Sequence, residues 1–212
     1  WRQWHRRPKA GDGRRPRTTR FARLPLPEIA LDGSTTARLS EPELLRLLKL
    51  PAPDATGWSP SAFSTRRLRD GEAVFRAGDP CESVYALRLG FARTVLANAQ
   101  GEERVHAFPM RGDLVGGDGI DTGYYASTVV ALGLAEVVII PLAQIHGPSA
   151  TTRGLDQRLL PAIAREVARD QRAQAILGMS RAEARVAAFL LLMGERFAEI
   201  GYASTSYRLR MG

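Results

Sequence analysis

The chain has 212 residues, of which 44% are hydrophobic and 25% charged, a composition typical of a globular protein with one core and part of a second. It contains no run of about 18 apolar residues and no apolar segment behind its basic N-terminus, which argues against a membrane-spanning helix and a signal peptide. The single cysteine, Cys81, excludes an internal disulfide bond and predicts a reducing compartment, the cytoplasm. Because the first residue is Trp rather than Met, we expect the chain to be a fragment of a longer protein.

Residues 1–30 are predicted to form a disordered basic arm. Nine of the first 24 residues are Arg or Lys and one is Asp, so this stretch accounts for the whole net charge of +8. Charged residues mixed with Pro and Gly do not build a core. The arm is compatible with non-specific binding to nucleic-acid phosphates, or with a linker or wrongly joined upstream sequence. Arg outnumbers Lys by 28 to 2 over the whole chain, which favours the second interpretation.

Residues 31–64 are predicted to hold one helix followed by a loop. Ser40 and Glu43 have the spacing of a capping box, in which each side chain satisfies an open backbone donor at the start of a helix. The leucines of LLRLLKL then provide an apolar helix face. Pro51 and Pro53 are expected to end the helix, and the Pro-, Gly- and Ser-rich stretch behind them is typical of a loop.

Residues 65–147 are predicted to form a β-rich domain. Short apolar runs of four to eight residues, rich in Val, Ile, Phe and Tyr, alternate with turn signals such as Asp70-Gly71 and Gly112-Asp113. Many short strands at close spacing are typical of a sandwich or barrel of the jelly-roll type. The expected strands are AVFRA, SVYALRL, FARTVLA, RVHAFPM, STVVAL and AEVVIIPL.

Residues 155–179 are predicted to contain one long helix that starts at Pro161 and ends at Met179. Proline suits the first turn of a helix because its missing N–H group would have no partner there. Apolar residues recur at steps of three and four, which fits a helix that pairs with its own copy or an amphipathic helix on its own core. The seam of the expected homodimer consists of Leu160, Ile163, Val167, Asp170, Gln174 and Leu177.

Residues 180–212 are predicted to begin with a second amphipathic helix over 181–200. Ser180 and Glu183 have the spacing of a capping box, and Gly201 is a suitable C-terminal stop. A strand-like segment over 207–211 ends the chain. A β-rich domain followed by separate helices indicates an α+β protein.

Two segments of the β-rich domain contain distinctive sequence motifs. AVFRAGDPCESVYALRLG combines Gly78-Asp79 with a small residue at Cys81 and with Gly90, and MRGDLVGGDGIDTGYYAS contains the run GDLVG that begins at Gly112. These motifs are specific for one protein family when they are taken together with EVARDQ in the long helix and AEARVAAFLLLMGERFAEIGY beyond it. From about Thr65 onward the chain resembles the Crp/Fnr family of bacterial transcription regulators, and the second segment resembles its Fnr branch most.

The resemblance implies a cyclic-nucleotide-binding-type β-roll (jelly roll) over 65–147, a dimerisation helix over 155–179 and the beginning of a winged helix-turn-helix domain over 180–212, without the recognition helix. It implies a homodimer that senses an unknown small effector, binds DNA in its full-length form and has RNA polymerase as a further partner. It implies no catalytic residue, no metal, no membrane partner and no enzyme activity. The candidate effector cassette consists of Gly112, Asp113, Gly116, Gly117, Asp118 and Ser127.

The sequence departs from the family pattern at the positions that bind its known signals. Cyclic-nucleotide binders of the family use a Glu early in the cassette and an Arg just before a Ser, and these positions hold Gly117 and Ala126. Backbone N–H groups could still cradle an anion, but without the guanidinium we expect no tight binding of cyclic AMP. The oxygen-sensing branch needs four thiolates for an iron–sulfur cluster, whereas this chain offers Cys81 and carries Val138 at the strand position, so no cofactor is expected.

Two alternative functions remain open from the sequence. One is a stand-alone effector-binding or scaffold protein that never binds DNA. The other is a cupin-like metal enzyme, which needs two or three His converging in a barrel, whereas of His5, His106 and His146 only His106 lies on an expected strand. His106 is interpreted as a structural histidine rather than a haem ligand, and Cys81 as a small turn residue rather than a redox thiol.

Overall fold

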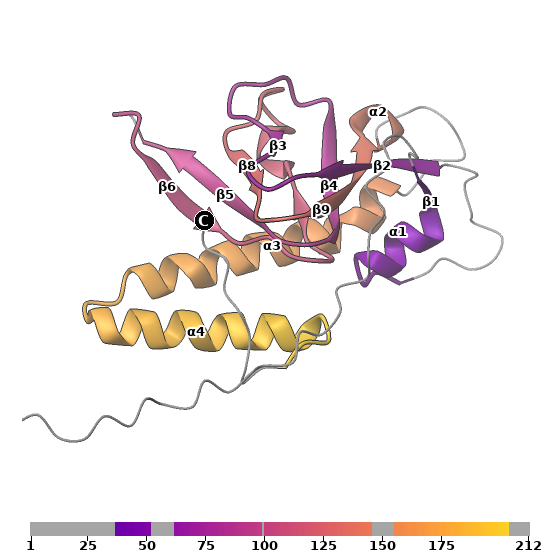
Figure 1. Cartoon of the computed structure of the whole chain (residues 1–212). Helices are drawn as coiled ribbons and strands as arrows, with labels where there is room; N and C mark the ends of the chain where they lie inside the picture. Colours follow the sequence, from indigo (N-terminus) through magenta and orange to yellow (C-terminus); the bar gives the residue numbers. More distant parts are fainter. Residues whose placement is uncertain (1–36, 52–61, 99, 146–154, 204–212) are drawn as a thin grey trace, which may run out of the picture. The chain divides into compact units, whose positions relative to one another are not determined.

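The computed structural model describes residues 37–51, 62–98, 100–145 and 155–203. They all belong to one of the chain's two compact units, which spans residues 36–212. The expected basic arm at 1–30 and the expected strand at 207–211 lie outside the described residues. Within the described residues, two antiparallel sheets form a β-roll and the longest helices follow it in the chain, which confirms the α+β jelly-roll prediction (Figure 1).

Strands that are distant in sequence pair in both sheets of the roll. Within the described residues, the five-stranded sheet has the order β1 (Arg38–Ser40), β2 (Ala62–Leu68), β9 (Ala135–Pro141), β4 (Ser83–Leu89) and β7 (Leu114–Val115). The four-stranded sheet of the same residues has the order β3 (Ala73–Phe75), β8 (Thr128–Ala131), β5 (Ala92–Ala97) and β6 (Glu103–Ala107). The pairs of β2 with β9 and of β3 with β8 are examples of this long-range pairing.

The six strands expected from apolar runs are confirmed as β3, β4, β5, β6, β8 and β9. Three further strands, β1, β2 and β7, were not predicted. Strands β1 and β7 have three and two residues, too few to show a period of two. In β2 the pair Arg66 and Arg67 interrupts the apolar pattern, although Phe63, Thr65 and Leu68 are buried.

Strand β9 lies in the middle of the five-stranded sheet and is buried on both faces. Val137 packs among the residues between the two sheets, whereas its neighbours Val138 and Ile140 pack in the second core, on the side of the helices. A strand covered on both faces carries a continuous apolar run instead of an alternating one. This explains why AEVVIIPL is apolar almost throughout.

Helix α1 (Glu41–Leu47) begins at the predicted capping box. The Ser40 backbone N–H donates a hydrogen bond to the Glu43 carboxylate at 2.8 Å, and the Ser40 hydroxyl donates another at 2.7 Å. The hydrogen bonds lower the pKa of Glu43, because they stabilise its ionised form. The box therefore fixes the point where β1 turns into the helix.

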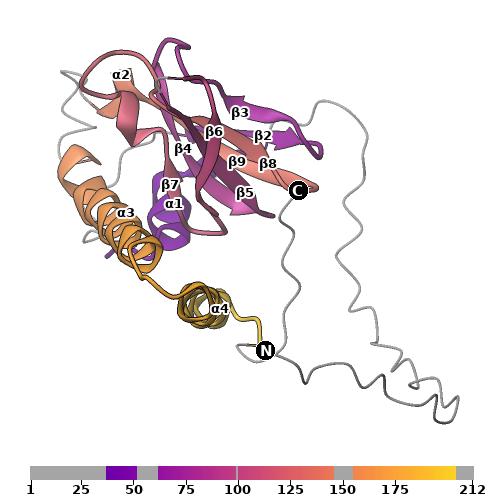
Figure 2. The same cartoon turned by 90° about the vertical axis from the view of Figure 1, so that its left-hand side faces the viewer.

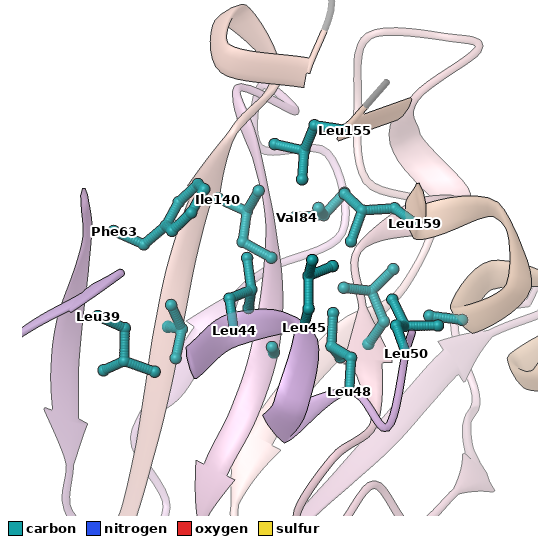
Figure 3. Packing of buried hydrophobic residues seen from close by; sticks show 14 residues of the cluster. Leu39, Leu44, Leu45, Leu48, Leu50, Phe63, Val84, Ile140, Leu155 and Leu159 are labelled. Carbon is teal, nitrogen blue, oxygen red and sulfur yellow. The ribbon is translucent and has the colours of Figure 1, made fainter. Parts of the chain in front are cut away.

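Helix α3 (Leu155–Leu177) contains Pro161 in its interior, so the prediction that Pro161 starts the helix is wrong. An internal proline removes a backbone hydrogen bond and costs about 3 kcal/mol. The buried side chains of Leu155, Leu159 and Ala162 offset this cost, because they pack on the five-stranded sheet. Figure 3 shows Leu155 and Leu159 in the same cluster as Ile140. Tertiary packing therefore overrides the local preference of proline.

Polar contacts join α1 to α3 around this core. Buried Glu41 of α1 forms an ion pair with Arg158 of α3. Arg165, two turns further along α3, donates a hydrogen bond at 3.0 Å to the backbone carbonyl of Leu48, just beyond the end of α1. A guanidinium at the carbonyl end of a helix also interacts favourably with the helix dipole. The N-terminal helix thus fixes the first half of α3 on the roll.

Helix α4 (Ala182–Glu199) begins one residue later than predicted. Arg181 is the N-cap residue and has no side-chain cap, so the predicted capping box of Ser180 with Glu183 is wrong: Glu183 occupies the second helical position rather than the third. The predicted stop at Gly201 is confirmed by its positive φ of 88° and by its N–H, which donates to the Ala198 carbonyl at 3.0 Å.

Helix α4 follows α3 after a short turn and contacts the roll, on the same side as α3 (Figures 1 and 2). Met193 and Phe197 of α4 are buried in a small core with Met110, and Phe91 packs against it. The ring centroids of Phe91 and Phe197 are 5.5 Å apart.

None of the helices in the described residues combines the length and hydropathy that a membrane crossing requires.

Candidate functional site

A cavity of about 310 Å³ lies between the roll and α3. Its walls come from β5 and β6, from β7 and the short 3-10 helix η1 (Gly117–Gly119), from the start of β8, and from the middle of α3. The volume is at the lower end of the range for small-molecule sites. Most of the surface is apolar and is supplied by Leu96, Leu114, Val115, Val129, Ile163 and Val167.

Four of the six cassette residues predicted from the sequence line this cavity: Gly116, Gly117, Asp118 and Ser127. Gly116 has a φ of 89°, and a Cβ atom there would lie 3.1 Å from the Tyr125 ring. Glycine is therefore needed for the backbone to turn into the cavity wall. The structure brings these four residues together, and their role in binding an effector stays a prediction.

The other two cassette residues, Gly112 and Asp113, do not line the cavity. Gly112 has a φ of 88°, and a Cβ atom there would lie 3.0 Å from the backbone oxygen of Leu47, so it serves the packing of the roll on α1. Asp113 is 2% exposed and accepts a hydrogen bond from the Met110 backbone N–H at 2.7 Å. Their side of the loop faces the helices rather than the cavity, and their assignment to the effector cassette stays a prediction.

Asp113 is the centre of an ion-pair cluster that connects three parts of the fold. One carboxylate oxygen accepts a hydrogen bond from Arg169 of α3, and the other accepts one from Arg196 of α4. Arg196 also donates to the Phe108 carbonyl at 3.0 Å, and Arg169 reaches Glu199 at 3.4 Å. A buried carboxylate is stable only when such partners compensate the loss of water. We refer to Asp113, Arg169 and Arg196 as the Asp113 cluster.

Polar groups of β6 and α3 meet on one side of the cavity. The Nε2 atom of His106 on β6 lies 3.5 Å from a carboxylate oxygen of Asp170 on α3. Glu166, one turn earlier on α3, also lines the cavity. The pKa of Glu166 is raised from 4.5 to about 7, mainly by burial and also by the nearby Asp113, while Arg169 and Arg196 oppose the shift. The cavity therefore contains carboxyl groups whose negative charge is only partly balanced by neighbouring positive groups.

The two positions at which the family resemblance implies the cyclic-nucleotide-binding Glu and Arg both lie at the cavity. Gly117 and Ala126 line it and bring no charge. No Arg or Lys is among the lining residues in the described part of the chain. A buried phosphate in this space would have only backbone N–H groups as donors.

The predicted dimer seam divides between two environments. Ile163, Val167 and Asp170 line the cavity, so part of the seam faces the roll of the same chain. Leu160 and Leu177 are 62% and 64% exposed, and Gln174 is exposed as well. The exposed leucines leave an apolar surface on α3, and pairing with a second copy stays a prediction.

Sequence reasoning did not predict that His106 lines the cavity and did not single out Glu166. Both line the cavity together with Asp170, but they come from β6 and α3, which share no local spacing. A usable signal was the helical spacing of Ile163, Glu166 and Asp170, which places all three on one face. Among the described residues, no group of three or more His, Cys, Asp or Glu side chains is arranged as a metal site.

Cys81 lies inside the roll and not in a reactive environment. It is buried, and a Cβ atom on Gly119 would lie 2.8 Å from its sulfur. Burial raises the pKa of the Cys81 thiol, which disfavours the thiolate needed for redox chemistry. This supports the interpretation of Cys81 as a small packing residue.

Comparison with known proteins matches this architecture. The family model of the cyclic nucleotide-binding domain matches residues 65–147. The transcriptional regulatory protein btr of Bordetella pertussis is 35% identical over 145 residues, which cover 68% of this chain and 60% of btr. The fumarate and nitrate reduction regulatory protein of Escherichia coli is 33% identical over 144 residues, which cover 68% of this chain and 58% of that protein. The chain thus spans about three fifths of the length of these relatives.

Solved structures share the fold. FixK2 from Bradyrhizobium japonicum has a TM-score of 0.52 and 24% identity, over 63% of this chain and 67% of FixK2. A transcriptional regulator of the CRP family from Thermus thermophilus has a TM-score of 0.53 and 22% identity, over 69% of each chain. The family model shows that residues 65–147 belong to the cyclic nucleotide-binding domain family, and the chain as a whole is similar to regulators of the Crp/Fnr family.

Proposed function

We propose that this chain is the sensor and dimerisation part of a homodimeric, DNA-binding transcription regulator. In this proposal residues 65–147 form the sensor roll, residues 155–179 the dimerisation helix and residues 180–212 the beginning of the helix-turn-helix domain. Because the relatives are named as transcriptional regulators, we also propose that it acts in the cytoplasm with DNA and RNA polymerase as partners. Catalysis has no part in the proposal.

The observation that carries the proposal is the position of α3 between the cavity and α4. Glu166 of α3 lines the cavity, and Arg169, one turn later on the same helix, belongs to the Asp113 cluster. The same Asp113 carboxylate holds Arg196 of α4. A ligand that moves α3 against the roll must therefore disturb the contacts that hold α4.

This arrangement supports a sensor mechanism in two states. In one state the Asp113 cluster and the small core around Phe197 hold α4 against the roll. In the other state an occupied cavity would favour a different position of α3, so that α4 and the DNA-binding domain behind it change their orientation. Such a coupling requires that the effector bind the two states with different affinities.

The test uses the full-length gene product beside the 212-residue chain. DNA fragments are selected from a random pool with each protein at a fixed salt concentration, because non-specific phosphate binding falls steeply with salt. We expect a defined sequence with half-sites related by twofold symmetry for the full-length protein, and no selected sequence for the 212-residue chain. Failure of the full-length protein to select any sequence would contradict the proposal and favour a stand-alone effector-binding protein.

A further inference from the structure

The lining of the cavity has an unusual balance of charge. Three carboxyl groups reach it, from Asp118, Glu166 and Asp170, against one imidazole, from His106. No guanidinium or ammonium group of the described residues lines the cavity. An anion in this space would meet like charges at short range in a medium of low dielectric, which is strongly unfavourable.

The negative charge of Glu166, a largely buried carboxyl group, is only weakly balanced by positive groups. Its side chain is 23% exposed, and its hydrogen bond from Arg169 is long, at 3.5 Å. Arg169 balances the charge of Glu166 only in part, because the same guanidinium also forms ion pairs with Asp113 and Glu199. Asp170, on the same face of α3, lies 3.5 Å from the Nε2 atom of His106. One positive group placed between these two carboxylates would complete the site.

We propose that the cavity binds a small apolar molecule with a single positive charge, an alkyl- or arylalkylammonium ion, whose ammonium group pairs with Glu166 and Asp170. The aliphatic residues of β5, β8 and α3 surround its apolar part. This rests on the proposed function, because it takes the cavity as the effector site. It also departs from the anionic ligands for which the domain is named, in line with Gly117 and Ala126 at the two key positions.

Binding of an ammonium ion is expected to depend on pH through Glu166. The charged or titratable groups around this carboxyl are Asp113 from the roll, Arg169 and Asp170 on α3 and Arg196 on α4, with His106 of β6 across the cavity. The raised pKa, about 7, leaves Glu166 mostly neutral at pH 6 and mostly ionised at pH 8. An alkylammonium keeps its charge over this range. The affinity should therefore rise about tenfold from pH 6 to pH 8.

The experiment compares probes that share one carbon chain and differ in charge. Titration calorimetry with the 212-residue chain at pH 8 uses hexylammonium, hexan-1-ol, hexanoate and cyclic AMP. We expect hexylammonium to bind at least tenfold more tightly than hexan-1-ol, and hexanoate and cyclic AMP to give no measurable binding. Equal or tighter binding of hexanoate or cyclic AMP, or no binding of hexylammonium at millimolar concentration, would overturn the proposal.

Single substitutions test which carboxyl groups pair with the ammonium ion. Glu166→Gln and Asp170→Asn should each weaken hexylammonium binding about tenfold, and Glu166→Gln should also remove most of the pH dependence. Glu195→Gln removes a carboxyl group from an exposed position on α4 and should leave binding unchanged. Ala126→Arg, which places a guanidinium at an exposed position beside the cavity, should weaken hexylammonium binding more than it weakens binding of hexan-1-ol. Unchanged pH dependence in Glu166→Gln would contradict the assignment to Glu166.

The outcomes separate this proposal from the proposed function. If the full-length protein selects a DNA sequence but the cavity prefers anions, only the ligand class is wrong. If hexylammonium binds as expected but no DNA sequence is selected, the ligand class holds and the role in transcription fails.

Discussion

The two halves of α3 contact the rest of the chain in different ways. In the first half Leu155, Leu159 and Ala162 are buried in the same core as α1 and the five-stranded sheet, and Arg158 and Arg165 tie the helix to α1. This half is part of the roll's own core, so it is expected to unfold only when the roll unfolds.

The second half of α3, all of which the structure describes, has no fully buried apolar side chain and is held mainly by polar contacts. Arg169 binds Asp113, Val167 is half exposed and Leu177 is 64% exposed. Helix α4 adds Arg196 and a small apolar core. Segments with few buried apolar contacts open at lower free energy than a protein's main core. We therefore expect the second half of α3, together with α4, to open more easily than the first half of α3.

The largest effect is expected from removal of the charge of Asp113. Asp113→Asn leaves Arg169 and Arg196 without their shared carboxylate, and removal of one partner of a buried ion pair costs about 3–5 kcal/mol. We expect the loss to fall on α4 and the end of α3, because these segments depend on the cluster. Amide hydrogen exchange should show faster exchange in α4 and little change in β4 and β9.

Asp121→Asn is the matched control, because Asp121 is an exposed carboxylate of the same loop region. It should leave exchange in α4 unchanged. Equal loss of protection in the central strands and in α4 would show that the second half of α3 is not a separate unit, and would contradict the comparison.

The next effect tests the first half of α3. Leu159 is 1% exposed and its neighbour Leu160 is 62% exposed, so the same substitution probes two environments one residue apart. Leu159→Ala should lower the free energy of unfolding by about 3 kcal/mol, and Leu160→Ala by less than about 0.5 kcal/mol. Urea denaturation at low protein concentration measures both. A small effect of Leu159→Ala would mean that α3 is not anchored in the core.

A smaller effect is expected on self-association. In a homodimer built on the predicted seam, Val167→Glu would bring two carboxylates to the interface and weaken association about 30-fold, or about 2 kcal/mol. Ala168→Glu, one residue away on an exposed position outside the seam, should leave association nearly unchanged. Sedimentation equilibrium compares the two variants. Equal weakening by both would place the dimer surface elsewhere on α3.

Most of the fold follows from local patterns in the sequence. Turn glycines and apolar runs were enough to predict six strands, and Ser40 with Glu43 was enough to predict the start of α1. The start of α3 was mispredicted because Pro161 suggests a first turn, whereas distant side chains stabilise the helix before it. Local propensity cannot report such tertiary packing.

The candidate site was predictable only in part. The resemblance to the family's sequence motif identified the glycines and Ser127 that line the cavity. It also included Asp113, which lies three residues before Gly116 but faces α3 and α4. The meeting of His106 with Asp170 depends on how β6 and α3 pack, and 64 residues separate the two in sequence. Sequence spacing carries no information about such a contact.

A predicted effect of similar size concerns the protonation of Glu166, at the junction between the two halves of α3. Burial, together with the nearby Asp113, raises its pKa from 4.5 to about 7, so the folded chain binds this proton more tightly than the unfolded chain does. Between pH 4.5 and pH 7 the folded state holds more protons, and the contribution of Glu166 to stability falls as pH rises through that window. Above about pH 7 the contribution no longer changes.

Glu166→Gln should remove this dependence, because the amide resembles the protonated acid at every pH. The variant should match the parent near pH 5 and become more stable than the parent near pH 7.5, by roughly 2 kcal/mol, because most of the cost of ionising the buried carboxyl falls between these two pH values. Urea denaturation of both proteins at several pH values gives the difference between their free energies of unfolding. Groups that titrate in the same way in both proteins do not contribute to this difference. A difference that stays constant from pH 5 to pH 7.5 would show that Glu166 is ionised throughout, and that its charge is already compensated without a ligand.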